Sequence, residues 1–429
     1  MKILIIGSGG REHTLAWKIA QSKKVKKIYC APGNAGIAEI AECVPIDAND
    51  IEALAEFAEK ESIDLTIVGP EDPLAKGIVD LFEKKGLKIF GPSQKAAEIE
   101  ASKSFAKKLM LKYGIPTARG KSFTDIEEAS IYIDDMGAPI VVKADGLAAG
   151  KGVLVCQTRE EAKDALNLIM VKKAFGDAGK KVLIEDFLSG EEASFIAFTD
   201  GKNVLPLPTS QDHKPIFDGD KGPNTGGMGA YSPAPVAEPL TERIMNEIMI
   251  PTVKAMIAEG RPYKGVLYAG LMIDGDKINV VEFNCRFGDP EAQPLLMRLK
   301  SDIVPIMEAV VDERLDEVSM DIDSRPALCV VLANKGYPGD YSKGNKITGL
   351  SSVAMLNDVM VFHAGTGKKG DDFRANGGRV LGVTALGSDI LEAFHAAYAA
   401  CDLIQWLGKY NRKDIGAKAK QRLKKKKKE

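Results

Sequence analysis

The first hundred residues alternate short apolar runs with stretches in which apolar residues recur at helical spacing. Strands are predicted at KILIIG (2–7), KKIYCAP (26–32), DLTIVGP (64–70) and LKIFGP (87–92). Helices are predicted between them, from Arg11 onward and near 51–60 and 75–85. Strands that alternate with helices indicate a parallel, doubly wound sheet. The loops after its strands meet at one edge and predict a common crevice there, formed by GSGGREH (7–13), PGNAG (32–36) and GPEDPL (69–74).

The pattern changes after a long helical stretch at 93–113, which a glycine and a proline end. Antiparallel hairpins with two helices are predicted from 118 to 209, followed by a glycine-rich connection at 218–233 and a helix at 240–259. A further hairpin and a last α+β unit follow. We therefore predict an α/β and α+β multidomain chain, divided into residues 1–101, 102–324 with a hinged part at about 118–190, 325–417, and a basic tail at 418–429.

Composition is that of an ordinary globular protein, with 45% hydrophobic and 28% charged residues and a net charge of −2. Charge is concentrated only in the tail, where eight basic residues and one acidic residue give +7. A lysine run at a terminus is usually solvated, and no aromatic residues are interleaved for nucleic-acid binding. We expect a disordered tail whose removal has little effect, and no nucleic-acid partner.

Cysteine and histidine usage points to the cytoplasm. Six cysteines are scattered without a C-x-x-C pair, which is typical of reduced thiols in a cytosol. Four histidines lie far apart, so no zinc-ligand spacing occurs. No stretch is long and apolar enough for a signal peptide or a membrane span. We expect a cytoplasmic enzyme without a membrane partner.

The most specific chemical pattern is VEFNCRFGDPEAQ (281–293). Side chains alternate along a strand, so Glu282, Asn284 and Arg286 are expected on one face. A carboxylate and an amide oxygen suit Mg²⁺, and a guanidinium suits an anionic oxygen. Asp289 follows directly and makes a functional acidic site more credible than a merely polar sheet face.

A second pattern is VVKADGLAAGKGVLV (141–155), in which a glycine-rich loop lies between two apolar runs with Lys143 and Lys151 at its ends. Glycines let backbone N–H groups approach phosphate, and lysine supplies charge. The loop is no Walker motif, because G-x-x-x-x-G-K-[ST] is absent. By itself a flexible turn explains it equally well.

Two further segments are polar where a site could form. EDFLSGEE (185–192) offers a strand end that could meet an adenine, with Glu192 for ribose hydroxyls. The long stretch at 211–233 contains Asp212, His213 and Lys214, which a solvated turn explains about as well as a substrate site.

The loop GSGGREH is not a dinucleotide fingerprint. The third glycine of G-x-G-x-x-G would fall at Glu12, and the second strand ends in Cys30-Ala31-Pro32 without a ribose-binding acid. A helix that starts after Gly9 and Gly10 still suits a phosphate monoester.

Taken in order, these motifs resemble the glycinamide ribonucleotide synthetase (phosphoribosylamine–glycine ligase) family over nearly the whole chain. GPNTGGMGAYSP and RFGDPEAQ carry the resemblance most specifically. It implies a substrate-binding N-terminal domain, an ATP-grasp domain with a hinged lid and a closing C-terminal domain. The implied reaction is ATP-dependent ligation of glycine to 5-phosphoribosylamine in purine biosynthesis, with Mg²⁺ or alternatively Mn²⁺. A transient contact with the enzyme that makes phosphoribosylamine is also implied.

The resemblance assigns roles to individual residues. ATP-binding residues are implied at Lys103, Lys143, Lys151, Glu185, Phe187, Leu188 and Glu192. Metal ligands are implied at Glu282 and Asn284. Catalytic residues are implied at Arg286, Asp212 and Lys214. Substrate contacts are implied at Gly9, Gly10, Arg11, His213 and Asp289.

Two positions depart from the family's pattern. The strand before the metal glutamate has YAGLM (268–272) where an additional carboxylate is often found, and Pro215 replaces a basic residue after Asp212–Lys214. The alternatives are another ATP-grasp carboxylate–amine ligase or carboxylase, or a nucleotide-sensing or nucleic-acid-binding protein that uses the basic tail.

Overall fold

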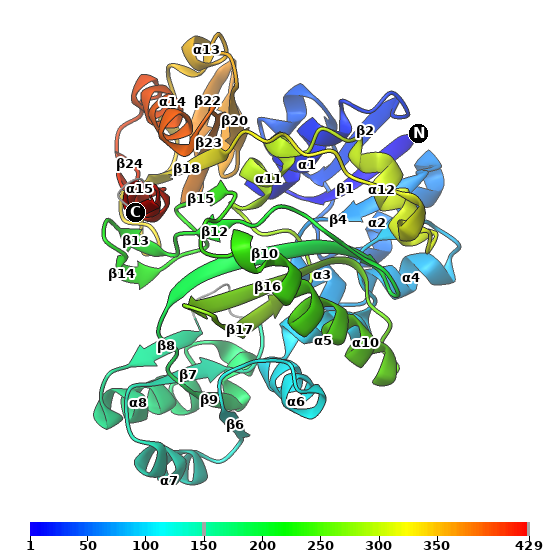
Figure 1. Ribbon diagram of the computed structural model, residues 1–429. Coiled ribbons are helices and arrows are strands. Elements are labelled where there is room, and N and C mark those ends of the chain that lie inside the picture. Colours follow the sequence, from blue (N-terminus) through cyan, green and yellow to red (C-terminus); the bar gives the residue numbers. More distant parts are fainter. Residues whose placement is uncertain (148–151, 427–429) are drawn as a thin grey trace.

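The first hundred residues form the predicted parallel sheet in the computed structural model, which describes residues 1–147 and 152–426. Its strands, in spatial order, are β3 (Glu42–Cys43), β2 (Lys27–Pro32), β1 (Lys2–Gly7), β4 (Leu65–Val68) and β5 (Ile89–Phe90). All its pairings are parallel. Its helices are α1 (Gly10–Ile19), α2 (Ile51–Glu61), α3 (Glu71–Ala75) and α4 (Ile78–Lys84) (Figure 1). Apolar side chains of β1 are buried on both faces, as a doubly wound sheet requires.

The helix predicted at 93–113 is wrong as a single element. Two helices occupy the segment, α5 (Gln94–Ala101) and α6 (Lys103–Tyr113). Ser102 between them is extended, and its hydroxyl accepts a hydrogen bond from the Phe105 amide at 3.1 Å. A serine that caps a new helix competes with continuation of the old one. The break places Lys103 in the first turn of α6.

Residues 120–186 form a separate antiparallel sheet with two helices and a small core of their own (Figure 1). Its strands, in order, are β6 (Gly120–Phe123), β9 (Val182–Asp186), β7 (Ile140–Ala144) and β8 (Val153–Cys156), and its helices are α7 (Ile126–Met136) and α8 (Arg159–Leu166). This unit lies below the rest of the molecule in the view of Figure 1.

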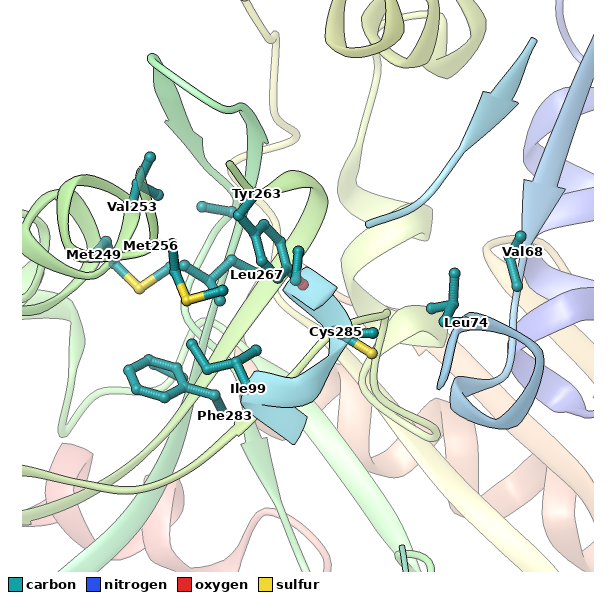
Figure 2. Close-up of a cluster of buried hydrophobic side chains, with 14 of the residues drawn as sticks. Val68, Leu74, Ile99, Met249, Val253, Met256, Tyr263, Leu267, Phe283 and Cys285 are labelled. Carbon is teal, nitrogen blue, oxygen red and sulfur yellow. The ribbon is translucent and has the colours of Figure 1, made fainter. Parts of the chain in front are cut away.

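A second antiparallel sheet forms the middle of the molecule. Its strands, in order, are β11 (Val204–Pro206), β10 (Glu191–Asp200), β16 (Lys264–Asp274) and β17 (Lys277–Asn284). The helix predicted at 240–259 consists of α9 (Thr241–Ile244), a π-helical turn (Met245–Met249) and α10 (Ile250–Ala258). Figure 2 shows Met249 and Met256 beside Phe283 of β17 and Ile99 of α5, all buried in one core. This packing fixes β17, whose other face carries Glu282 and Asn284.

The C-terminal sheet begins with strands that precede residue 325. Its order is β12 (Gln211–Asp212), β15 (Gly229–Ser232), β18 (Ala327–Asn334), β23 (Arg379–Leu386) and β20 (Val359–His363), with β24 (Lys409–Tyr410) also on β18. Smaller sheets hold β13 (Pro215–Phe217) with β14 (Lys221–Asn224), and β19 (Asn345–Lys346), β22 (Asp372–Ala375) and β21 (Thr366–Lys369). Helices α11 (Ala292–Arg298), α13 (Leu350–Val353) and α14 (Ile390–Leu403) pack near this region, whereas α12 (Ile303–Val311) packs against β5, β10 and β16. The glycine-rich segment is therefore built into the C-terminal sheet.

The prediction of a disordered tail is wrong for residues up to 426. They form helix α15 (Ala417–Lys426), which Figure 1 places beside β13 and β14. Alanine and lysine are good helix formers, and Ala419 is buried in the C-terminal core. Tertiary packing of this face stabilises a helix that charge repulsion alone would oppose.

Candidate active site

One cleft of about 870 Å³ is lined by residues from the N-terminal, central and C-terminal regions of the chain. Two of the three predicted sheet-edge loops contribute Gly9 and Pro70, whereas no residue of PGNAG (32–36) lines the cleft. The sheet of residues 120–186, which corresponds to the predicted lid, contributes Lys143, and the C-terminal sheet contributes Arg379. A large cleft between domains with converging polar groups is the usual form of a small-molecule site.

A buried carboxylate joins two lysines at the lid side of the cleft. Glu185 Oε1 lies 2.7 Å from Lys107 Nζ, and Glu185 Oε2 lies 2.5 Å from Lys143 Nζ. All three side chains are at most 8% exposed. Lys143 also donates to the Val281 carbonyl at 2.9 Å, so the lid sheet is tied to β17. Lys107 lies in no recognised motif, and the sequence did not predict it as a site residue.

Lys103 points from α6 to the glycine-rich loop. Its Nζ donates to the Gly146 carbonyl at 2.8 Å, and burial lowers its pKa. Asp145 accepts a hydrogen bond from the Ser104 amide at 2.9 Å, which holds the start of this loop at the N-terminus of α6. The predicted Lys151 lies outside the described residues.

Glu282 and Asn284 lie on β17 and both line the cleft, as the strand alternation predicts. Lys214 bridges Glu282 at 3.2 Å and Glu192 at 3.1 Å. Lys214 is the main cause of the lowered pKa of Glu282, which falls to about 2. Glu282 is therefore ionised at neutral pH.

Arg286 is held by two carboxylates, one from the predicted crevice loop GPEDPL (69–74) and one from a helix without a motif. Its Nε lies 3.0 Å from Glu71 of α3, and its Nη2 lies 2.7 Å from Glu100 of α5. These partners lie 215 and 186 residues away in sequence. The guanidinium lines the cleft but is oriented by this pair.

The N-terminal loop meets the segment after β17 at the other end of the cleft. Arg11 donates through Nη1 to the Phe287 carbonyl at 3.0 Å, and its amide donates to Asp289 at 3.3 Å. Arg379 lies 3.4 Å from the same carboxylate. A Cβ at Gly9 would lie 2.8 Å from the Glu12 carboxylate, so a larger residue here would displace that side chain. Gly9 lines the cleft together with Arg11 and Asp289.

Asp212 lines the cleft, whereas His213 turns away from it. Burial and the Glu291 carboxylate raise the pKa of Asp212 well above its usual value. The His213 ring is buried, 3.2 Å from the Gly229 carbonyl and against Tyr231. Successive residues of an extended segment point to opposite sides, and this alternation separates the two side chains. The predicted substrate contact of His213 is not supported by this placement.

Family models match the chain almost from end to end. They are described as the N domain of phosphoribosylglycinamide synthetase, over residues 1–100, its ATP-grasp (A) domain, over 101–292, and its C domain, over 327–418. The chain belongs to the phosphoribosylglycinamide synthetase family. A curated relative, phosphoribosylamine–glycine ligase of Allochromatium vinosum, is 56% identical over 98% of this chain and 99% of its own length.

Solved structures agree on the fold. A phosphoribosylamine–glycine ligase from Thermotoga maritima is 32% identical, with a TM-score of 0.83 over 97% of this chain and all of that one. The biotin carboxylase domain of Hydrogenobacter thermophilus 2-oxoglutarate carboxylase, solved with MgADP, ADP and bicarbonate, has a TM-score of 0.74 at 17% identity. It covers 96% of this chain and 91% of that one. The family fold of this chain is thus an ATP-grasp fold with N- and C-terminal domains.

Within this family fold, the structure brings most predicted site residues to one cleft. Cleft-lining members of the predicted set are Lys103, Lys143, Glu185, Phe187, Leu188, Glu192, Glu282, Asn284, Arg286, Asp212, Lys214, Gly9, Arg11 and Asp289. Gly10 and His213 are not among the lining residues. Lys107, Glu100 and Arg379 line it without having been predicted, and Glu71 lines it from the predicted loop GPEDPL (69–74) without an assigned role. A helical lysine or glutamate outside a glycine-rich motif gives no sequence signal of its own.

Proposed function

We propose that this chain is the ATP-dependent ligase that joins glycine to 5-phosphoribosylamine, giving glycinamide ribonucleotide, ADP and phosphate in purine biosynthesis. The observation that carries the proposal is the single cleft in which the ATP-grasp lysines, the Glu282–Asn284 pair and the N-terminal Gly9–Arg11 loop converge. Three substrates must meet for this reaction, and this cleft offers chemically distinct ends for them.

The lid side of the cleft is the ATP end. Lys103 and Lys143 supply positive charge for phosphates, and Phe187 and Leu188 line the cleft where an adenine edge would bind. Glu192 would accept hydrogen bonds from ribose hydroxyls. Glu185 holds Lys143 in place and pairs with Lys107 as well.

Glu282 and Asn284 are the residues that would hold a divalent cation. Glu282 is ionised and shares a strand face with the Asn284 amide, a set of hard oxygen donors. Among residues 1–147 and 152–426, no group of three or more His, Cys, Asp or Glu side chains forms a metal cage. This donor set fits Mg²⁺, which commonly uses one or two protein carboxylates with substrate phosphates, and Mn²⁺ is the alternative. When bound, the cation would neutralise charge on the transferring phosphoryl group.

The N-terminal end of the cleft suits the phosphoribosyl group. Gly9 and Arg11 at the start of α1 line this end, and a helix N-terminus favours a phosphate monoester. The phosphate would replace the Glu12 and Asp289 carboxylates, which accept hydrogen bonds from the Gly9 and Arg11 amides. Arg286, Asp212 and Lys214 line the same cleft, and we assign glycine to them.

The chemistry follows from this arrangement. A glycine carboxylate oxygen attacks the γ-phosphorus of ATP, and ADP leaves, which gives glycyl phosphate. The amine nitrogen of phosphoribosylamine then attacks the glycyl carbonyl carbon, phosphate leaves, and the nitrogen loses one proton. Arg286 and Lys214 stabilise the negative charge that develops, and Asp212 is placed to take up the proton. The chain mainly positions reactants, as phosphoryl transfer generally requires.

Two assays test this function. ADP release should require ATP, glycine and phosphoribosylamine together, and leaving out any one should abolish it. Glycine labelled with ¹⁸O in its carboxylate should transfer one labelled oxygen to the released phosphate. Turnover with bicarbonate or another amine acceptor instead would identify the alternative, another ATP-grasp ligase or carboxylase. Unlabelled phosphate would refute the glycyl phosphate step.

The partners in this proposal are small molecules, with a transient contact to the enzyme that supplies phosphoribosylamine. Within the described part of the chain, no helix has the length and apolar character needed to cross a bilayer. We place the reaction in the cytoplasm.

A further inference from the structure

The C-terminal segment contacts the loop that carries the central site residues. Lys214 immediately precedes β13, Asn224 ends β14, and residues 225–226 follow it. Both ends of this hairpin line the cleft. The hairpin turn points away from the cleft toward α15 (Figure 1). The position of Lys214 therefore depends on what holds the hairpin.

The turn of the hairpin is held by charged contacts. Asp220 lies 2.9 Å from Arg412 and 2.7 Å from Lys418 of α15. The Gly219 amide donates to Asp414 at 2.8 Å. Because these contacts join both sides of one short turn, they restrict its movement as a unit.

Arg412 is the centre of this contact. Its side chain is only 1% exposed, and it donates to the Pro215 carbonyl at 3.0 Å as well as to Asp414 at 2.7 and 2.8 Å. A buried guanidinium is tolerated only when its donors are satisfied, so the surrounding geometry is tightly specified. Pro215 is the residue next to Lys214, so this bond acts one residue from the site.

A second contact of the C-terminal segment lies next to Glu192, an ion-pair partner of Lys214. Arg422 of α15 lies 2.5 Å from Glu191 at the start of β10. The next residue, Glu192, forms the 3.1 Å ion pair with Lys214 across the cleft. The same C-terminal segment thus holds the backbone beside both Lys214 and Glu192.

We propose that residues 410–422 act as a positioning clamp that fixes Lys214 between Glu192 and Glu282 and so sets the affinity for glycine and phosphoribosylamine. This rests on the proposed function for its substrates. The clamp residues touch no reacting atom; they act through the hairpin. The expectation that the basic tail is dispensable is replaced by a specific role for its first turns.

The test is the double variant Lys418→Ala/Arg422→Ala in the full-length protein, with Lys346→Ala as control. Lys346 pairs with Asp372 at 2.8 Å in the same C-terminal region, away from the hairpin. Partly exposed ion pairs each change an equilibrium by about 2- to 5-fold, so KM for glycine or phosphoribosylamine should rise about 5- to 20-fold. KM for ATP should rise as well, because Lys214 pairs with Glu192 and Glu282, which the proposed function assigns to the ATP ribose and the cation.

A general loss of folded protein would lower kcat and leave every KM unchanged, and that result would overturn the clamp. Hydrogen exchange across 213–227 gives a readout independent of activity: it should accelerate in the double variant and not in Lys346→Ala. Reversing the second pair, with Glu191→Arg and Arg422→Glu together, should restore the protection from exchange that Arg422→Glu alone loses. Unchanged exchange in the double variant also overturns the proposal. If the wild-type protein fails to ligate glycine, the function is wrong, and exchange still decides the clamp.

Discussion

Lys107→Met is the most informative single substitution, because the structure gives this lysine a role that no motif announced. Its ammonium donates to Thr117 Oγ1 at 2.6 Å and to the Ala118 carbonyl at 2.7 Å, and it pairs with Glu185 at 2.7 Å. Breaking a buried ion pair costs about 3–5 kcal/mol. Lys143 still neutralises Glu185 in the variant, so we expect the lower end, about 3 kcal/mol.

The loss should be local to the lid sheet, since Glu185 lies on β9. Hydrogen exchange of residues 182–186 measures it, and about 3 kcal/mol corresponds to roughly 10²-fold faster exchange through local opening. Lys112→Met is the matched control: the same change on the same helix, at a side chain that is 63% exposed and paired with Glu259. Equal exchange in the two variants would refute the argument that the buried triad stabilises the lid.

Three further predictions follow from the site and the domain contacts. Glu282→Gln should lower kcat at least ~10²-fold, since cation stabilisation of phosphoryl transfer is worth several kcal/mol; near-normal turnover at saturating Mg²⁺ would exclude this ligand. A non-hydrolysable ATP analogue should protect residues 143–147 and 152–156 from hydrogen exchange, and unchanged exchange there would exclude closure over ATP. Burial lowers the pKa of His13 to about 3 and that of His363 to about 4. Between pH 6.5 and 4 these two imidazoles therefore bind protons in the unfolded chain but not in the folded one. Stability should therefore fall with falling pH there by about 1.4 kcal/mol per unit for each histidine, and a melting series with an unchanged slope in His363→Gln would contradict this.

Much of the fold follows from local periodicity. Alternating apolar strands and helices predict the N-terminal parallel sheet, whose loops at Gly9 and Pro70 do line one cleft. The two-residue repeat of a strand likewise places Glu282 and Asn284 together on the cleft face and Phe283 on the opposite face, in the core. These features need only near-neighbour sterics and burial, which the sequence encodes directly.

Other features depended on segments far apart in the chain. The carboxylates on Arg286 come from α3 and α5, and the partner of Lys107 comes from β9. No periodicity relates such residues, because their proximity is set by how whole elements pack.

The sequence by itself determined the order of the elements, the chemistry of the motifs and the strand face that carries the acidic site. Only the tertiary structure decided that His213 leaves the cleft, that a capping serine splits α5 from α6, and that the basic tail folds into α15. The tail shows the physical reason most clearly. Its charges would repel in isolation, yet Asp220 and Glu191, brought together by the folding of two other segments, supply the opposite charges that allow the helix to dock.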